Sequence, residues 1–412
     1  MSLYVLKFGG SSVGTISRIR HVASIVEKFI ERGDRVVIVT SAMQGVTNHL
    51  IDLTKSFTET IYSVTKRIDG GRVRPLSRPP ASEFMGDNIM HREYDAVIST
   101  GEQMAAGLLA LCLCSMDIPA ISLNCWQIPI RSDGNFSNAN ITEINAENIL
   151  DFVTRGIVPV ITGFQGVSSD GDVMTIGRGG SDATACIVSH ATGAEECLIY
   201  TDVDGVYTAD PRTVLNTKWL REISYDEMLA LSHGGARVMQ AKSVLIARRY
   251  KLRVRILSSF IESEGTVMTG KTTYAHQDHR IAGIAHNTTI ARITIHNYNA
   301  TKWKGILEQI DQIRLIQIDG DELHALIPKT SVPAIKETLC GGYVIDENAG
   351  LITIAGQGFK ADPSVLIRIT EIAGDHGIQI KNIVVGESEI SIVVPLQNTE
   401  EVVNYLHAGF IE

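Results

Sequence analysis

The sequence has no apolar run long enough to cross a membrane and no excess of positive charge. Its longest apolar run, Met104 to Met116, has 13 residues, whereas a membrane-spanning helix needs about 20, so we expect a buried helix there. The balance of 37 basic and 46 acidic residues argues against a general nucleic-acid-binding surface. No stretch has the form of a secretory signal. We therefore expect a cytoplasmic protein that binds neither nucleic acid nor a membrane.

Cysteine is also sparse, and several familiar motifs are missing. The six cysteines include no CxxC pair, which disfavours a disulfide framework. The HxxH at His276 and His279 has no cysteine partner nearby, so we expect a solvated loop there and assign no metal ligand. The absence of GxxxxGK[ST] excludes a P-loop enzyme, and "GGSSVG" lacks the GxGxxG spacing of a dinucleotide-binding oxidoreductase.

Strand and helix signals alternate over roughly the first 260 residues. This alternation predicts an α/β domain with a mainly parallel sheet between two helix layers. Helices are expected from Thr15 to Arg32 and from Gly101 to Met116, and an insertion from about Ser63 to Arg92. Apolar runs typical of buried strands are "YVLKF", "RVVIVTSA", "DAVIST", "PAISLNCW", "GIVPVITGF" and "ECLIYTDV".

After Phe260 the chain becomes polar and then carries shorter strand signals. "ARITIHNY" and "LITIAG" predict strands in two small α+β units that form a weak internal repeat, and "GIQIKNIVV" with "EISIVVP" predicts a hairpin. The expected domains are residues 1–262, 280–345 and 346–412.

Two glycine-bearing stretches have the composition of anion-binding turns. In "LKFGGSSVG", Lys7 precedes Gly9 and Gly10 at an expected strand-to-helix turn, where free N–H groups and the helix dipole favour phosphate. In "TIGRGGSDATA", Arg178 supplies a cation and Asp182 is a residue type that caps helices. Either stretch alone is also compatible with an ordinary surface turn. Together they indicate a ligand with several anionic groups.

A third stretch, "YTDVDGVYTADPR", carries acidic residues just after an expected strand. Thr201 and Asp202 end that strand, and Asp204 and Asp210 follow in the turn. A solvated turn would explain this composition. Because open α/β sheets bind ligands at the carboxyl ends of their strands, a nucleotide-ribose or Mg²⁺ role is also compatible with it.

The order and spacing of seven motifs resemble the aspartate kinases of the amino-acid kinase superfamily. The motifs are "KFGGSSV", "SAMQGVTN", "STGEQ", "GFQG", "GRGGSDATA", "YTDVDGVYTADPR" and "SYDEMLALSHGGARV". The resemblance implies a three-layer amino-acid kinase sandwich followed by two ferredoxin-like ACT units. It also implies ATP and Mg²⁺ as cofactors and the conversion of L-aspartate and ATP to 4-phospho-L-aspartate and ADP. That reaction is the first step towards lysine, diaminopimelate, threonine and methionine.

The resemblance further implies a role for each matching residue. Lys7, Gly9 and Gly10 would hold the transferring phosphoryl group, and Asp182 would organise the catalytic groups. The residues expected to bind aspartate are Ser41, Thr47, Glu102, Arg178, Gly179, Gly180 and Ser181. Those expected to bind the nucleotide are Lys7, Gly9, Gly10, Thr201, Asp202, Tyr207, Asp210, Arg212, Arg237 and Val238.

Two segments depart from the pattern of this family. "GARVMQAK", Gly235 to Lys242, replaces the frequent "GAKVLHPR", and "NYNATKWKGILEQI" lacks the turn that usually opens the effector-site helix of the first ACT unit. The tail is thus expected to join subunits into a homo-oligomer, and a lysine or threonine effector stays an open alternative. Two other functions also stay open. One is another amino-acid kinase, such as N-acetylglutamate kinase or glutamate kinase; the acetylated substrate of the former offers Glu102 no cation. The other is an inactive, effector-binding regulatory protein.

Overall fold

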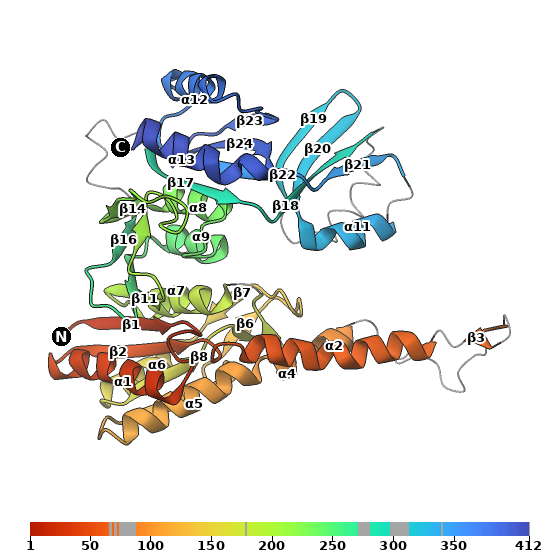
Figure 1. Ribbon diagram of the computed structural model, residues 1–412. Coiled ribbons are helices and arrows are strands. Elements are labelled where there is room, and N and C mark those ends of the chain that lie inside the picture. The colour runs from red at the N-terminus through yellow and green to blue at the C-terminus, as the bar shows by residue number, and fades with distance from the viewer. Residues whose placement is uncertain are drawn as a thin grey trace. The chain divides into compact units, whose positions relative to one another are not determined.

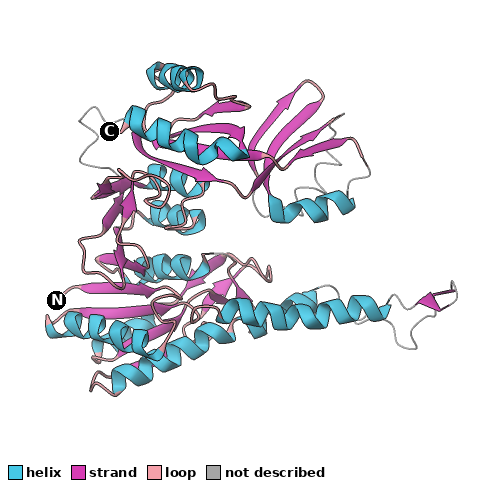
Figure 2. Cartoon of the chain, viewed as in Figure 1, coloured by secondary structure: helices cyan, strands magenta, loops and turns pink. Residues whose placement is uncertain are grey.

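The computed structural model describes residues 1–65, 68–69, 72–73, 88–177, 179–270, 281–296, 313–338 and 341–411. The chain divides into two compact units, whose elements are drawn in Figures 1 and 2. Unit 1 comprises Met1–Val206 and Val238–Gly270, and unit 2 comprises Tyr207–Arg237 and Lys271–Glu412. The domain boundaries expected from the sequence stay predictions.

A mainly parallel sheet lies at the centre of unit 1. Neighbouring strands pair in parallel, except that β16 runs antiparallel to β15. The strands bury continuous apolar runs, as expected for a sheet covered on both faces. In spatial order they are β16 (Thr266–Thr269), β15 (Val254–Ser258), β11 (Glu196–Thr201), β1 (Leu3–Phe8), β2 (Arg35–Thr40), β8 (Val158–Thr162) and β5 (Ala120–Leu123).

Helices cover both faces of this sheet and complete a three-layer α/β fold, as the sequence predicts. Helices α1 (Ile16–Glu31) and α5 (Thr100–Cys114) lie on one face, and α7 (Gly180–Thr192) lies on the other (Figure 1). Helix α1 begins where the Thr15 hydroxyl accepts a hydrogen bond from the Arg18 N–H, an N-cap that satisfies an otherwise unpaired donor. The other helices among the described residues of unit 1 are α2 (Val46–Thr65), α4 (Asn88–Ile98), α6 (Glu147–Thr154) and α9 (Ala241–Tyr250).

One predicted strand is wrong. "DAVIST" was expected to be a strand, but Asp95 to Ile98 form the end of helix α4. Its apolar run is short, and a short run does not distinguish a strand from a buried helix. The expected insertion from Ser63 to Arg92 falls mostly outside the described residues, as do His276 and His279.

Short strands form smaller sheets in unit 1. One has the order β10-β9-β6-β7, with β6 Ile130–Ser132, β7 Ile141–Ile144, β9 Gln165–Val167 and β10 Val173–Thr175. Another pairs β3 (Ile68–Asp69) with β4 (Arg72–Val73). The β10–α7 connection carries the second glycine stretch.

Unit 2 contains two four-stranded antiparallel sheets, consistent with the predicted pair of small α+β units. The first consists of β17 (Ile281–Asn287), β22 (Ala349–Gly356), β24 (Glu389–Pro395) and β23 (Asn382–Val385). The second consists of β19 (Arg314–Asp319), β20 (Glu322–Pro328), β18 (Ile290–Ile295) and β21 (Tyr343–Asp346). The expected hairpin is confirmed as β23–β24. Strand β17 precedes β18 in the sequence but belongs to the first sheet, where it pairs with β22.

The helices of unit 2 pack against these sheets. Helix α8 (Tyr225–Gly234) begins with a capping box between Ser224 and Glu227, which satisfies two helix-end donors. Helix α8 packs closely on β17 and β22. A Cβ added to Gly234 of α8 would lie only 2.6 Å from the Cβ of Thr353 in β22. The remaining elements are β12 (Val206–Tyr207), β13 (Trp219–Leu220), β14 (Glu222–Ser224), α11 (Val332–Thr338), α12 (Ser364–Asp375), α13 (Thr399–Phe410) and the 3₁₀ turns Lys329–Ser331 and Leu396–Asn398.

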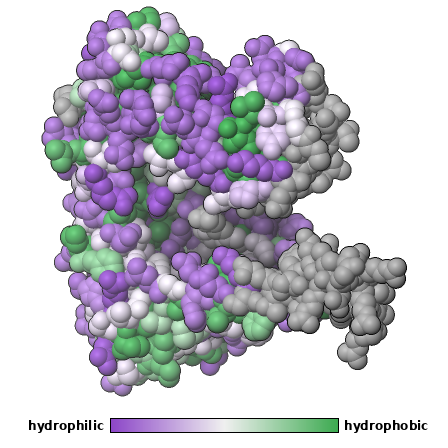
Figure 3. Space-filling view, turned by 45° about the vertical axis from the view of Figure 1, so that its right-hand side comes forward, coloured by the Kyte–Doolittle hydropathy of each residue, from purple (hydrophilic) through white to green (hydrophobic). Residues whose placement is uncertain are grey.

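One helical stretch among the described residues, Ile89–Cys114, is long and apolar enough to cross a membrane by length and composition. Half of its apolar window, 50%, is buried inside the structure, as in the core helix of a globular protein. Its inner face contributes Ala105, Leu109 and Leu113 to the core under the central sheet. On the face shown in Figure 3, hydrophilic residues surround the smaller apolar patches. The apolar run from Met104 therefore forms a helix with one buried face.

Candidate active site

The first glycine turn lies at the carboxyl end of β1. The Gly9 N–H donates to the Tyr200 carbonyl at 3.1 Å, and the Gln44 N–H donates to the Gly10 carbonyl at 3.0 Å. A Cβ added to Gly10 would lie 2.9 Å from the Ala42 carbonyl oxygen, so only glycine allows this close approach. The turn is thus held between the ends of β11 and β2.

The second glycine loop leads from β10 into α7. Gly179 has φ +75° and caps the helix, a left-handed conformation that favours glycine. Ser181 and Asp182 follow in the first turn of α7, where the helix dipole is positive. The N-terminal end of α7 is therefore suited to an anion.

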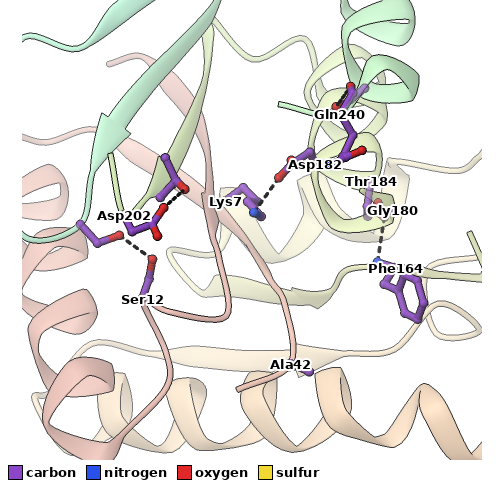
Figure 4. A network of polar contacts seen from close by, with 12 residues as sticks. Lys7, Ser12, Ala42, Phe164, Gly180, Asp182, Thr184, Asp202 and Gln240 are labelled. Carbon is purple, nitrogen blue, oxygen red and sulfur yellow. Dashed lines mark hydrogen bonds and ion pairs between the residues drawn. The ribbon is translucent and has the colours of Figure 1, made fainter. Parts of the chain in front are cut away.

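An ion pair connects the two glycine stretches. Lys7 Nζ lies 2.6 Å from Asp182 Oδ1, and the two side chains are only 9% and 12% exposed. Figure 4 shows them pointing toward one another from β1 and α7. A buried lysine needs such a partner, and this one leaves its ammonium group beside Gly9, whose added Cβ would lie 3.4 Å from Nζ.

Glu102 is a second buried carboxylate, in the first turn of α5. It is 3% exposed, and its Oε1 accepts a hydrogen bond from the Ala42 N–H at 3.0 Å. Its Oε2 is buried with no hydrogen-bond partner among the described residues. Burial raises the pKa of Glu102 to about 7, because desolvation penalises the charged form. When Glu102 is ionised, its Oε2 is therefore available to pair with a cationic group in the cavity.

These groups line one cavity of about 330 Å³ in unit 1. The predicted residues brought together there are Lys7, Gly10, Ser41, Thr47, Glu102, Gly179, Gly180, Ser181 and Asp182. Other lining residues were not singled out from the sequence, although they lie in or beside the quoted motifs: Ala42, Met43, Gln44, Gly45, Asn48, Phe164 and Gly177. A larger cavity of about 410 Å³, lined by His190 and Tyr250 among others, contains none of the predicted residues. Charged groups rather than volume therefore mark the candidate site.

The predicted nucleotide-binding residues outside this cavity are divided between the two units. Thr201 is the last residue of β11 and Asp202 follows it in unit 1, where the Thr201 hydroxyl donates to Asp202 Oδ1 at 3.1 Å. Val238 also belongs to unit 1, whereas the following belong to unit 2: Tyr207, Asp210, Arg212 and Arg237.

Two of the unit 2 residues form a local pair. The Arg212 guanidinium binds both carboxylate oxygens of Asp210, at 3.0 and 2.7 Å, and these bonds lower the pKa of Asp210. Arg237 is exposed. Arg178 lies outside the described residues. The roles of these residues remain predictions.

The cavity fits a magnesium ion that arrives with a nucleotide. Mg²⁺ is usually held by one or two carboxylates together with substrate phosphates. Asp182 supplies a buried carboxylate at the cavity. Within the described part of the chain, no three His, Cys, Asp or Glu side chains gather closely enough to hold a metal by themselves. The donor set therefore suits a phosphate-bound ion.

Comparison with known proteins agrees with this fold. Residues 2–258 match the amino acid kinase family. The chain is 34% identical over 429 residues to an aspartate kinase of Stutzerimonas stutzeri, covering 100% of this chain and 97% of that protein.

Two solved structures of E. coli aspartokinase III are similar over 100% of both chains. The complex with aspartate and ADP has a TM-score of 0.78 and 24% identity. The complex with lysine and aspartate has a TM-score of 0.72 and 23% identity. The fold and the sequence match define a member of the amino acid kinase family. Within that family the chain belongs to the aspartate kinases, to which it is similar along its whole length.

Proposed function

We propose that this enzyme transfers the γ-phosphoryl group of Mg·ATP to the side-chain carboxylate of L-aspartate, giving 4-phospho-L-aspartate and ADP. The observation that carries the proposal is the buried Lys7–Asp182 pair, 2.6 Å apart, in one cavity with both glycine stretches and Glu102. In the cell, the product would serve the routes to lysine, diaminopimelate, threonine and methionine, and we propose a cytoplasmic location.

The chemistry needs no general base. The side-chain carboxyl of free aspartate has a pKa of about 4 and is ionised at neutral pH, so it can attack phosphorus directly. The enzyme must align two anions and offset their repulsion. Lys7 can neutralise phosphoryl oxygens, and Asp182 holds that ammonium group in place. The N-terminal end of α7 contributes a positive dipole toward the same cavity.

Aspartate recognition uses one buried anion and one cation. We assign the substrate ammonium to Glu102, whose Oε2 has no hydrogen-bond partner among the described residues. We assign the substrate α-carboxylate to Arg178, assisted by Ser181. An acetylated amine would present no charge to Glu102, so this arrangement disfavours N-acetylglutamate as the acceptor.

Magnesium, when bound, would neutralise charge on the nucleotide phosphates, and Asp182 is the residue that could hold it. Of the predicted nucleotide-binding residues, Gly9 and Gly10 allow backbone N–H groups to approach phosphate. Thr201, Asp202, Tyr207, Asp210, Arg212, Arg237 and Val238 are proposed to bind the rest of the nucleotide.

For residues 280–345 and 346–412 we propose a pair of ACT units that join subunits into a homo-oligomer. Lysine binding by a similar fold, E. coli aspartokinase III, supports testing lysine first as an effector and threonine second. The segment that departs from the effector-site pattern lies at 297–310, outside the described residues.

The test is ADP release from Mg·ATP with aspartate, glutamate and N-acetylglutamate as separate acceptors. We expect turnover with aspartate alone, and inhibition assays with lysine and threonine follow on the same preparation. Turnover with only one of the other acceptors would show that this acceptor, and not aspartate, is the substrate. An enzyme inactive with all three would instead favour an effector-binding regulatory protein.

A further inference from the structure

Lys242 lies where a lysine is locally unfavourable. It belongs to the first turn of α9, which contains no acidic residue, and the positive end of the helix dipole repels a cation there. The side chain is half-buried, and burial lowers the pKa of its ammonium group. A residue that costs stability locally is expected to contribute elsewhere.

The ammonium group of Lys242 bridges two separate backbone segments. Its Nζ donates to the Ala139 carbonyl at 2.9 Å and to the Ile176 carbonyl at 2.9 Å. The Ala139 N–H also donates to the Thr175 carbonyl at 2.9 Å. Lys242 therefore connects Ile176, the first residue after β10, to the segment that contains Ala139. This connection lies at the start of the second glycine loop.

The same turn of α9 contacts the far end of that loop. A Cβ added to Gly179 would lie 2.4 Å from Gln240 Cβ, so Gln240 packs directly on the residue that caps α7. Residues 240–242 thus hold the loop at Ile176 and at Gly179, on both sides of Arg178.

The buried carboxylate of Asp95 holds the end of β10, directly before the residue that Lys242 binds. Asp95 is fully buried and accepts hydrogen bonds from the Thr175 N–H at 2.9 Å and the Thr175 hydroxyl at 2.8 Å. It also accepts from the Ser137 N–H at 2.7 Å. Because Asp95 secures the strand end, what remains for Lys242 to set is the path of the loop beyond Thr175.

We propose that Lys242 is a positioning residue for aspartate binding: by holding Ile176, it fixes the start of the loop that leads through Gly179 to Ser181. The inference rests on the proposed function, because it assigns these loop residues to the aspartate side of the site. Displacing a substrate-binding group by about 1 Å costs on the order of 100-fold in rate. Loss of Lys242 is therefore expected to weaken aspartate use far more than ATP use.

The test compares Lys242→Met with Lys242→Arg in the full-length protein. Lys28→Met is the matched control, because Lys28 lies on α1 with its side chain 65% exposed. Steady-state KM for aspartate and for ATP, kcat and the melting temperature are measured for each variant. Lys242→Met should raise the aspartate KM about 10- to 100-fold and the ATP KM less than about twofold. Lys242→Arg should keep the aspartate KM much closer to the wild-type value than Lys242→Met does. Lys28→Met should match wild type in both KM values.

Several outcomes would overturn the inference. If both KM values rise by the same factor, or if only the melting temperature falls, Lys242 merely stabilises the fold. If Lys242→Met does not fold, Lys242→Gln is assayed by the same criterion. A wild-type protein that does not use aspartate overturns the proposed function and this inference together. Active wild type with an unaffected Lys242→Met variant overturns this inference alone.

Discussion

Replacing Glu102 with glutamine should separate aspartate binding from ATP binding. Glutamine keeps the shape of the side chain and an oxygen that can accept the 3.0 Å hydrogen bond from the Ala42 N–H. It removes the negative charge on the buried Oε2 side, which has no partner among the described residues. A hydrogen bond to a charged group contributes about 1.5–3 kcal/mol, and about 1.4 kcal/mol is a tenfold change in affinity. We therefore expect the aspartate KM to rise about 10- to 100-fold while the ATP KM stays constant.

The pH dependence gives this prediction a second readout. With a pKa of about 7, Glu102 is mostly protonated at pH 6 and mostly ionised at pH 8. Only the ionised form pairs with the substrate ammonium, so kcat/KM for aspartate should rise about tenfold across this range. The Glu102→Gln variant should lack this rise.

The same pKa also predicts a change in stability. Because the folded-state pKa exceeds the unfolded value of 4.5, the folded state holds the proton more tightly than the unfolded state. The free energy of unfolding therefore falls as pH rises from 4.5 through 7. Without substrate, Glu102→Gln should melt above wild type at pH 8 and near wild type at pH 5.

The assay is steady-state ADP release from pH 6 to 8, with aspartate and ATP varied separately. An unchanged aspartate KM in Glu102→Gln would refute the assignment of Glu102 to the substrate ammonium. An equal rise in both KM values would also refute it, since that result indicates a general distortion of the cavity.

Three other substitutions test different parts of the molecule. Arg178→Ala should raise the aspartate KM well above any change in the ATP KM, and equal changes would contradict its proposed role. Lys7→Met should lower kcat on the order of 100-fold or more, because it removes a fixed charge at the transferring phosphoryl group; single-turnover ADP formation measures this, and an unchanged rate would exclude Lys7 from the chemistry. Gly234→Ala should destabilise unit 2 by about 1–3 kcal/mol, because the new Cβ would lie 2.6 Å from Thr353 Cβ. Urea unfolding checks this, and an unchanged midpoint would show that the packing relaxes without cost.

The sequence predicts the parts of the fold that depend on local signals. Strand β1 and helix α1 follow from one apolar run and from the helical spacing of apolar residues after Thr15. The two glycine stretches likewise indicate anion-binding turns from residue types and order alone. The strand predicted from Asp95 to Thr100 was wrong because its three apolar residues, Ala96 to Ile98, fit both a strand and a helix.

The remaining features depend on contacts between distant segments. The Lys7–Asp182 pair forms because α7 packs on the sheet that contains β1, and no local pattern specifies that distance. The raised pKa of Glu102 depends on complete burial against the Ala42 turn. Lys242 gave no signal either, because its carbonyl partners belong to residues far away in sequence.

The packing of α8 limits how this protein can be divided. Gly234 and Gly235 fit so closely to the β17–β22 sheet that added Cβ atoms would lie 2.6 Å from Thr353 Cβ and 2.4 Å from the His286 carbonyl oxygen. A chain shortened to end at residue 262 would keep α8 but lose the sheet that covers it, and would expose the face of α8 that carries Gly234. We expect such a fragment to aggregate. Exchange of the tail between relatives should succeed only when α8 is exchanged with it.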